Sequence, residues 1–343
     1  MNHKIRLLTW GWTAVALVSF ASAQSYKVIQ LGALGGESYA AGINGKGQVA
    51  GTSYISNHGQ GGHHTHAFLW TSGKGMQDLG TLGGKDSEGF AVNNLGQVVG
   101  LSWLAGDAKS HAFLWTQAGG MQDLGTLGGP KSAASAISRS GQVAGWAETT
   151  SGDIDAFLWT AAGGMQDLGN LGGGEAFATA ITDDGVVTGY SYTQSDGNNR
   201  IFLWTSHGGM KDLGKLDAKA AAPTAINNQL TIVGSFFPKG SQEVQAFVRL
   251  SGMKAQDIGL GESLGVNSAG SVVGETTPDG NGDAAFLWTQ AAGMLDLGKL
   301  IPPHQGKTLI DAVSISANGK IAGDENISGL GTRAVLLVPS TKR

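Results

Sequence analysis

The chain has 343 residues, 22 Lys and Arg against 26 Asp and Glu, and a formal net charge of −4 at pH 7. A mildly acidic chain with scattered charges lacks the basic patch that nucleic-acid binding requires, so we expect no nucleic-acid partner. It contains no cysteine, which excludes a disulfide-stabilised scaffold, and its 57 glycines recur at fixed positions, which indicates tight turns rather than disorder.

The first 23 residues have the composition of a secretory signal peptide. Lys4 and Arg6 precede an uncharged apolar run over residues 7–20, and small residues at 21–23 supply a cleavage site. The apolar run is too short to span a bilayer, and no later run is long enough, so we expect no integral membrane segment. The prediction is an exported protein, extracellular or periplasmic, with residues 1–23 removed and residues 24–343 forming one domain.

A phrase close to Ala-Phe-Leu-Trp-Thr, followed by Gly-Gly-Met-Gln-Asp-Leu-Gly, recurs along the rest of the chain. Its Phe stands at Phe68, Phe113, Phe157, Phe202, Phe247 and Phe286, and a degenerate seventh copy has Val335. The spacings between copies are 45, 44, 45, 45, 39 and 49 residues. A nearly fixed period of this length predicts stacked supersecondary units.

One repeat, residues 84–129, shows the predicted elements in order. Residues 90–93 form a short strand, and residues 97–100 begin a second strand after an Asn-Leu-Gly turn. A variable loop follows, and residues 111–116 and 121–124 are the third and fourth strands. No segment has sustained helical periodicity, so each repeat is expected to be a four-stranded antiparallel meander.

The predicted strands are apolar on both faces, since Phe113 and Trp115 alternate with Ala112 and Leu114. A sheet buried on both faces lies between two others, which favours a β-propeller over an open solenoid or a β-helix. The last Gly of the Val-Val-Gly motif counts the blades, and it stands at Gly51, Gly100, Gly145, Gly189, Gly234, Gly274 and Gly323. The predicted fold is all-β: a seven-bladed β-propeller of four-stranded antiparallel blades.

The two ends of the repeat array complement each other. The last repeat stops after its third strand, and residues 26–36 match a fourth strand and its exit. We predict that the N-terminal strand completes the last blade and closes the ring, which removes the open sheet edges. A closed ring needs no partner copy, so a monomer is expected.

A Trp and an Asp eight residues apart recur in the repeats. The pairs are Trp70 and Asp78, Trp115 and Asp123, Trp159 and Asp167, Trp204 and Asp212, and Trp288 and Asp296, while Arg249 precedes Asp257 in the fifth repeat. We predict that each Asp accepts a hydrogen bond from the indole or guanidinium; the alternative is that each Asp caps its own turn. Six equivalent copies indicate scaffold rather than a catalytic ring.

A ligand site is expected among positions that do not repeat, on the face that holds the loops between second and third strands. Aromatic residues follow the Val-Val-Gly motif there, namely Tyr54, Trp103, Trp146, Tyr190, Tyr192 and Phe237. Their flat rings suit sugar rings or peptide side chains, so we predict that they bind a ligand. Packing between blades is the alternative.

Two loops contain residues that could bind metals. Asp279, Asn281 and Asp283 resemble the start of a calcium loop without its later Glu, and an ordinary acidic turn is the alternative. His58, His63, His64 and His66 lie in a Gly-rich loop, which is either a transition-metal site or a polar loop. Apart from this calcium hypothesis we expect no cofactor.

The segment His-Ala-Phe-Leu-Trp-Thr at residues 111–116, with the phrase that follows it, resembles the HAF repeat of bacterial extracellular proteins. The similarity covers about residues 26–339 and implies secretion and a repeat fold, with no established activity and no catalytic residue. Here the His is present only at His66 and His111, while other copies have Asp155, Arg200 or Gln245, which argues against a catalytic role for it.

The leading functional hypothesis is a secreted binding propeller whose ligand is a glycan or a protein and which needs no catalysis. The alternative is a propeller hydrolase or lyase that acts on polysaccharide or lactone substrates. Its acids would lie on the central loop face, and Asp107, Glu148, Asp153 and Asp324 are candidates. No nucleophile elbow, phosphate-binding loop or zinc-protease motif is present, so we assign no catalytic residue.

Overall fold

The computed structural model describes residues 25–56, 64–195, 198–214, 216, 218–277, 283–303 and 307–340. Across these residues the named elements are β-strands, apart from one short 3₁₀-helix, η2 (Leu297–Leu300). No helix in these ranges is long and apolar enough to cross a bilayer. The predicted signal peptide lies outside the described residues. The all-β class is confirmed.

The strands follow the repeated phrase, and we number the repeats 1 to 7 in chain order. Repeat 1 contains β2 (Ser38–Ile43), β3 (Val49–Tyr54), β4 (Thr65–Thr71) and β5 (Gly75–Asp78), and repeat 2 contains β6 (Gly83–Val92), β7 (Val98–Leu104), β8 (Ser110–Thr116) and β9 (Gly120–Asp123). Repeat 3 contains β10 (Gly128–Ile137), β11 (Val143–Thr149), β12 (Ile154–Thr160) and β13 (Gly164–Gly169), and repeat 4 contains β14 (Gly172–Ile181), β15 (Val187–Thr193), β16 (Asn199–Thr205) and β17 (Gly209–Asp212). Repeat 5 contains β18 (Ala218–Ile226), β19 (Ile232–Pro238), β20 (Gln245–Arg249) and β21 (Gln256–Leu260), and repeat 6 contains β22 (Glu262–Val266), β23 (Val272–Thr276), β24 (Ala284–Thr289) and β25 (Gly293–Asp296). Repeat 7 contains β26 (Lys307–Ile315), β27 (Ile321–Ile327) and β28 (Gly331–Ser340).

Each repeat is an antiparallel meander, but the repeats are not all separate sheets. Repeats 1, 5 and 6 are independent four-stranded sheets, whereas repeats 2, 3 and 4 join into one twelve-stranded mixed sheet. The joints are single parallel pairs, Lys131 with Ser110 and Glu175 with Ile154. They lie in the early parts of β10 and β14, which begin at Gly128 and Gly172 and so are longer than the short first strand predicted for a repeat. The division of these three repeats into separate four-stranded blades is therefore not shown.

The N-terminal strand β1 (Ser25–Gln30) joins the last repeat, in the sheet order β1-β28-β27-β26. It runs antiparallel to β28, with Ser25 opposite Ser340 and Gln30 opposite Val335. Tyr26 is 1% exposed and packs among the core side chains of repeats 6 and 7. The predicted pairing of the N-terminal strand with the last strand is confirmed.

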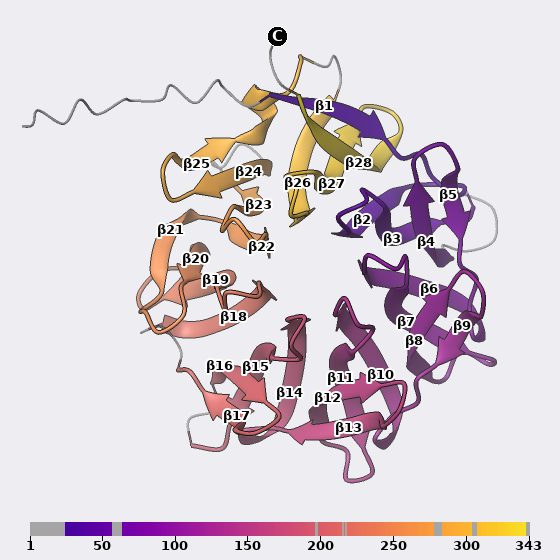
Figure 1. The fold of residues 1–343 in the computed structure, drawn as a ribbon, viewed down its shortest axis with the longest axis vertical. Coiled ribbons are helices and arrows are strands. Elements are labelled where there is room, and N and C mark those ends of the chain that lie inside the picture. Colours follow the sequence, from indigo (N-terminus) through magenta and orange to yellow (C-terminus); the bar gives the residue numbers. More distant parts are fainter. Residues whose placement is uncertain are drawn as a thin grey trace, which may run out of the picture.

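Figure 1 shows the sheets side by side in chain order around a central opening, with the first strand of each repeat innermost. Residues of β2, β6, β10, β14, β18, β22 and β26 together line this central channel. Apolar clusters fill the spaces between neighbouring repeats, and one of them combines Val99 of repeat 2 with Phe157 of repeat 3. The overall fold is propeller-like.

The repeated Gly of the second strand leaves the space that the repeated Phe of the third strand fills. Gly100 of β7 stands opposite Phe113 of β8, which is 0% exposed. A Cβ added at Gly100 would fall on the carbonyl oxygen of Glu88 and against the Phe113 ring. Only Gly leaves room there for the ring and for the neighbouring strand, which explains why the motif ends in Gly in every repeat.

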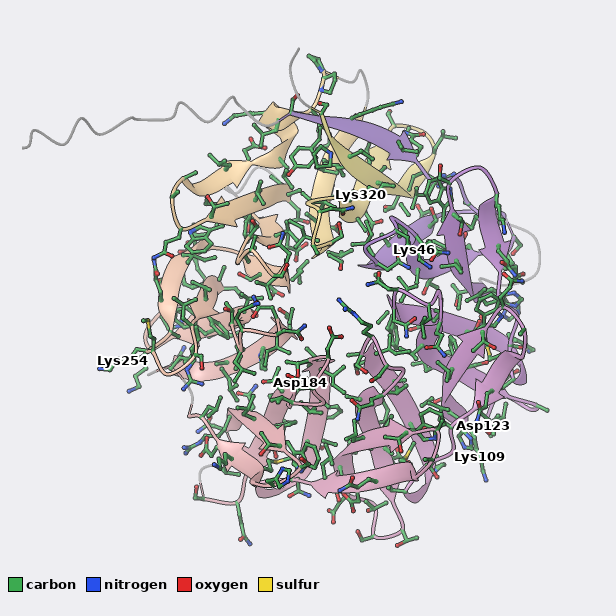
Figure 2. The ribbon with its side chains drawn as sticks, viewed as in Figure 1. Lys46, Lys109, Asp123, Asp184, Lys254 and Lys320 are labelled. Carbon is green, nitrogen blue, oxygen red and sulfur yellow. The ribbon has the colours of Figure 1, made fainter. Side chains whose placement is uncertain are left out.

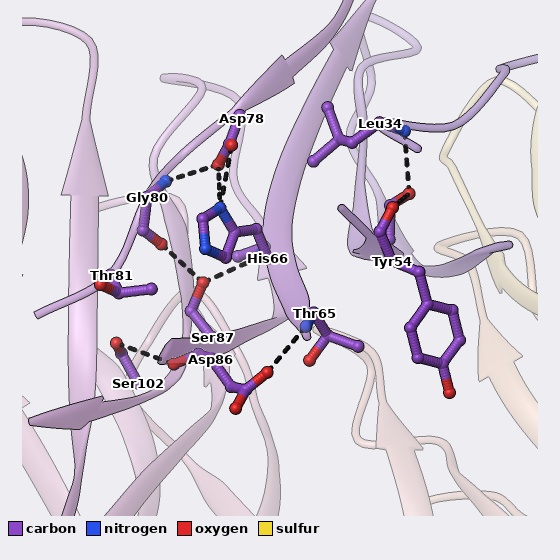
Figure 3. A network of polar contacts seen from close by, with 12 residues as sticks. Leu34, Tyr54, Thr65, His66, Asp78, Gly80, Thr81, Asp86, Ser87 and Ser102 are labelled. Carbon is purple, nitrogen blue, oxygen red and sulfur yellow. Dashed lines mark hydrogen bonds and ion pairs between the residues drawn. The ribbon is translucent and has the colours of Figure 1, made fainter. Parts of the chain in front are cut away.

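The repeated Asp caps its own turn and does not bind the Trp. The amide of Gly80 donates to Asp78 Oδ1 at 2.8 Å, and the amide of Gly125 donates to Asp123 Oδ1 at 2.8 Å (Figure 3 shows the first). A second contact comes from the His of the phrase, since His66 Nδ1 lies 2.9 Å from Asp78 Oδ1. No Trp indole donates to these carboxylates within the described part of the chain, so the predicted Trp–Asp bond is wrong and the turn-cap alternative is confirmed.

Buried serines connect repeats 1, 2 and 3 to the repeat before each of them. Ser87 Oγ of β6 accepts from the amide of Ala67 in β4 at 2.9 Å and donates to the carbonyl of Gly80 at 2.6 Å. Ser38 Oγ of β2 likewise accepts from the amide of Ala334 in β28 at 3.0 Å. The contact between the last repeat and the first is thus the same as the contacts between repeats 1 and 2 and between repeats 2 and 3.

Candidate functional site

The two ends of the channel differ in how they are built. One end, the turn face, holds the turns between first and second strands, where Asn44 Nδ2 donates to the carbonyl of Asn93 at 2.8 Å and Asn227 Nδ2 donates to that of Asn267 at 2.9 Å. Figure 2 shows Lys46 and Lys320 from these turns beside the central opening. Repeated, mutually satisfied groups of this kind are scaffold.

The other end, the loop face, holds the loops between second and third strands and the connections between repeats. In every repeat, one residue of the first strand and the residue opposite it on the second strand lie near the loop face. The first-strand residue comes shortly before the segment that lines the channel. We call these cross-strand pairs the mouth pairs: Tyr39 with Thr52, Glu88 with Leu101, Ala133 with Trp146, Phe177 with Tyr190, Ala222 with Ser235, Glu262 with Glu275, and Asp311 with Asp324. These positions do not repeat, so a unique site is expected among them.

The mouth pairs of repeats 3 and 4, together with Tyr192 of β15, bring four aromatic side chains into one row. The ring centroids of Trp146 and Phe177 are 5.8 Å apart, those of Phe177 and Tyr190 are 5.1 Å apart and stacked, and those of Tyr190 and Tyr192 are 6.4 Å apart. All four are half-buried. Burial raises the pKa of Tyr190, and the nearby Tyr192 and Glu175 add to this. We call these four residues the aromatic row.

The other predicted aromatic residues lie on different strands. Tyr54 ends β3 and contacts Tyr39 edge-on, with ring centroids 6.4 Å apart. Trp103 is half-buried near the end of β7, and Phe237 of β19 is 41% exposed. Of the six predicted side chains the structure therefore brings Trp146, Tyr190 and Tyr192 together.

A cavity of about 430 Å³ opens on the loop face between repeats 5 and 6. Its acidic lining residues are Glu243, Glu262, Glu275 and Asp283, and among the described residues that line it there is no Lys, Arg or His. We call this cavity the acidic pocket. It exists because Gly261 alone connects β21 to β22, whereas residues 124–127 connect β9 to β10.

Like charges and burial perturb the acids of this region. Burial raises the pKa of Glu275, and the carboxylates of Glu262 and Asp283 raise it further. Asp311 and Asp324 form the adjacent mouth pair, and burial raises the pKa of Asp311 to about 7 and that of Asp324 to about 8. The two halves of the loop-face mouth therefore differ, with aromatic rings in repeats 3 and 4 and carboxyl groups in repeats 6 and 7.

The predicted metal ligands are described only in part. Asp283 lines the acidic pocket, while Asp279 and Asn281 lie outside the described residues. His64 Nδ1 lies 3.2 Å from Asp86, and His58 and His63 again fall outside the described ranges. In the part of the chain that the structure describes, no group of three or more His, Asp or Glu side chains is arranged to hold a metal ion.

The four acids considered for a hydrolase do not converge. Asp107 Oδ2 lies 3.6 Å from Lys85 Nζ, and Asp153 accepts from Ser151 Oγ at 3.0 Å, both in loops of different repeats. Glu148 is on β11, and Asp324 on β27 is 3% exposed. The acids that do share a cavity are those of the acidic pocket, of which sequence reasoning named only Asp283, as a calcium ligand.

Two sequence signals point to the missed residues. Phe177 occupies a register position where the other repeats have Tyr39, Glu88, Ala133, Ala222, Glu262 or Asp311. The 39-residue spacing between Phe247 and Phe286, against 44 or 45 in the preceding repeats, marks the shortened connection that opens the acidic pocket. Both signals need the strand register before they can be interpreted.

Comparison with known proteins supports the fold alone. The sequence matches no protein-family model and no curated protein. Among solved structures, a puromycin hydrolase variant complexed with PGG superposes with a TM-score of 0.56 at 11% identity, over 88% of this chain and 52% of that one. TolB from Acinetobacter baumannii gives a TM-score of 0.48 at 11% identity, over 85% of this chain and 80% of that one. The chain thus spans about half of the hydrolase, and the likeness extends to the propeller-like fold.

Proposed function

We propose that the chain is an exported, monomeric seven-bladed β-propeller of the HAF-repeat kind that binds a glycan on its loop face. The seven meanders around one channel support the blade number, and β1 beside β28 supports closure of the ring. The serine contact from β2 to β28 repeats the contact between neighbours, as a closed ring requires. The resemblance of the repeat to extracellular proteins and the first 23 residues support export.

The aromatic row is the observation that supports glycan binding best. Sugar rings present apolar C–H faces that pack on aromatic rings, while their hydroxyl groups pair with polar edges such as those of Tyr and Trp. Two neighbouring repeats supply the row, so it is longer than one side chain and can contact more than one sugar unit. It is half-buried, which holds the rings in place while part of each remains accessible.

Packing between repeats does not by itself account for the row. In repeats 1, 2 and 5 the second-strand residue of the mouth pair is Thr52, Leu101 or Ser235 rather than an aromatic residue. These repeats are equally well formed. The repeated aromatic residues of the core, such as Phe157 and Phe202, are 0% exposed. The aromatic row differs from them in exposure and in occurring only once.

A glycan-array screen of the purified chain, with and without calcium, tests the proposal. We expect binding that falls about tenfold or more in Tyr192→Ala, because stacking on an aromatic ring contributes on the order of 1 kcal/mol or more. Phe237→Ala is the matched control, since it removes an exposed ring outside the row, and it is expected to bind normally. Equal loss in both variants, or capture of a protein partner with no glycan bound, contradicts the proposal.

The calcium hypothesis is tested by the same screen. Binding that requires calcium and is lost in Asp283→Asn supports a role for Asp279, Asn281 and Asp283 as ligands. Binding that is identical with calcium and with chelator leaves these residues as an acidic turn.

The acidic pocket favours a second candidate function, a hydrolase or lyase acting on polysaccharide or lactone substrates. Glu262 and Glu275 stand opposite each other in one cavity, and a raised pKa suits Glu275 to the role of general acid. Release of reducing ends from a panel of polysaccharides, and opening of model lactones, measures this activity. Loss of this activity in Glu275→Gln, with full activity in Glu88→Gln, supports the enzyme hypothesis. Glu88→Gln is the control because it changes a mouth-pair acid of repeat 2. No turnover of any of these substrates excludes the hypothesis.

A further inference from the structure

The contact between the last repeat and the first contains two carboxyl groups side by side. Asp311 of β26 stands opposite Asp324 of β27, and the amide of Asp324 donates to Asp311 Oδ1 at 2.8 Å. Asp324 is 3% exposed, and its Oδ1 accepts from the amide of Ala40 in β2 at 2.9 Å. Asp324 therefore connects repeat 7 directly to repeat 1, where the two ends of the chain meet.

The surroundings of the two groups are acidic. From repeat 6, Glu275 and Asp283 act on Asp311, and Glu262 lies opposite Glu275. From β2 and the segment before it come Tyr39 and Glu37, whose carboxylate accepts from the Tyr39 hydroxyl at 2.7 Å. The neighbouring acid Glu325 is held by Gln30 Nε2 at 2.8 Å.

The basic side chain on the adjoining strand β28 donates to a backbone carbonyl rather than to either carboxyl group. Arg333 of β28 donates from one guanidinium nitrogen to the carbonyl of Thr332 at 2.8 Å. Within the described ranges no ion pair involves Asp311 or Asp324. Two ionised carboxylates at this contact would repel each other with no cation to compensate.

We propose that Asp311 and Asp324 share one proton, and that loss of this proton loosens the contact between repeat 7 and β2, so that the closure of the ring is pH-sensitive. The shared proton allows one carboxyl group to donate to the other while Asp324 still accepts from Ala40. Removing it leaves two like charges in a buried contact. Burial raises the pKa of Asp311 to about 7 and that of Asp324 to about 8, and the Asp311 carboxylate raises the latter further, so the pair holds its last proton up to about pH 8.

The sign of the pH effect follows from these values. In the unfolded chain both groups lose their protons near the ordinary value of 3.8, whereas the folded chain keeps a proton up to pH 7–8. Between these limits the folded state binds more protons than the unfolded state, so stability falls as pH rises. Above about pH 8 both states have lost the proton and this decline ends.

Thermal unfolding of the full chain between pH 5 and pH 9 tests the proposal. The wild-type melting temperature should fall by about 5 °C or more over this range. Asp324→Asn should remove most of the decline, because the amide can donate to Asp311 permanently while its oxygen still accepts from Ala40. Glu88→Gln is the matched control, since Glu88 occupies the position of Asp311 in repeat 2 but faces Leu101. Burial also raises the pKa of Glu88 from its ordinary value of 4.5, so this variant should lose its own part of the decline but keep the fall in stability around pH 7–8.

Hydrogen exchange locates the effect. The amide of Ala40 should lose protection relative to that of Ala134, which has the same place in repeat 3, when the pH rises from 6 to 9. Asp311→Asn provides the same test if Asp324→Asn does not fold. Two results would overturn the proposal. One is a melting temperature that falls with pH as much in the folded Asn variant as in the wild type, and the other is equal hydrogen-exchange protection of the Ala40 and Ala134 amides at both pH values.

Discussion

Replacement of Tyr26 by Ala tests whether the N-terminal strand holds the ring together. Tyr26 is 1% exposed and packs with Leu297, Val335 and Leu337, which belong to the last two repeats. Truncating a buried aromatic side chain to Ala removes its apolar contacts and leaves a cavity, at a cost of about 3–5 kcal/mol. Because β1 adds only six residues to its sheet, losing this anchor should also release the rest of the strand.

Urea unfolding followed by tryptophan fluorescence measures the effect. We expect Tyr26→Ala to lower the free energy of unfolding by about 3–5 kcal/mol, and Tyr26→Phe, which keeps the ring, by less than about 1 kcal/mol. Burial also raises the pKa of Tyr26 to about 12, so stability should fall between the ordinary value of 10 and that pH, because the unfolded chain loses the proton first. If Tyr26→Ala is as stable as the wild type, β1 is a dispensable edge strand and the closure argument fails.

Two further substitutions test the scaffold by the same urea assay. Gly100→Ala forces a Cβ onto the Glu88 carbonyl and the Phe113 ring and should cost about 3 kcal/mol; a cost below 0.5 kcal/mol would show that the strands separate easily. Asp123→Ala should cost about 1 kcal/mol through loss of the turn cap, and its effect should add to that of Trp115→Phe, since the two side chains share no bond. A coupling energy above about 1 kcal/mol between them would restore the Trp–Asp interaction that the structure rejects.

Features set by local pattern could be predicted from the sequence. The alternation around Phe113, the Gly before each second strand and the matching chain ends depend on strand period and turn chemistry, which a single repeat displays. The structure agrees with these in the strand order, in the buried Phe and in the pairing of β1 with β28.

Features that depend on which groups approach each other in space could not be predicted in this way. The Trp–Asp correlation had a chemical rationale, yet Asp78 accepts instead from the backbone amide of Gly80, a donor only two residues away. The first strands of repeats 3 and 4 also extend beyond the predicted length, and each makes one parallel pair with the third strand of the preceding repeat.

The candidate site illustrates the same limit. Trp146 and Tyr190 were identified by their place after the Val-Val-Gly motif, but Phe177, which joins them, lies on a first strand whose register shifts at a bulge between Ala178 and Ala180. Counting residues along the repeat does not reveal the cross-strand partner when a bulge intervenes. The acidic pocket likewise arises from a shortened connection. Its signature in the sequence is therefore a deletion within one repeat rather than a motif of particular residues.

The residues that differ among the seven repeats restrict where a ligand can bind. Wherever the repeats agree, their polar groups satisfy one another: Asp caps a turn, Ser connects neighbours, and Asn pairs around the turn face. The mouth pairs differ from repeat to repeat, and they lie toward the loop face, just before the first strands line the channel. Aromatic rings occupy this position in repeats 3 and 4 and carboxyl groups in repeats 6 and 7, on different parts of one ring. A ligand that contacts both parts must cross the mouth of the channel, and the ring can hold those parts at a fixed separation only while the contact between repeats 7 and 1 is intact.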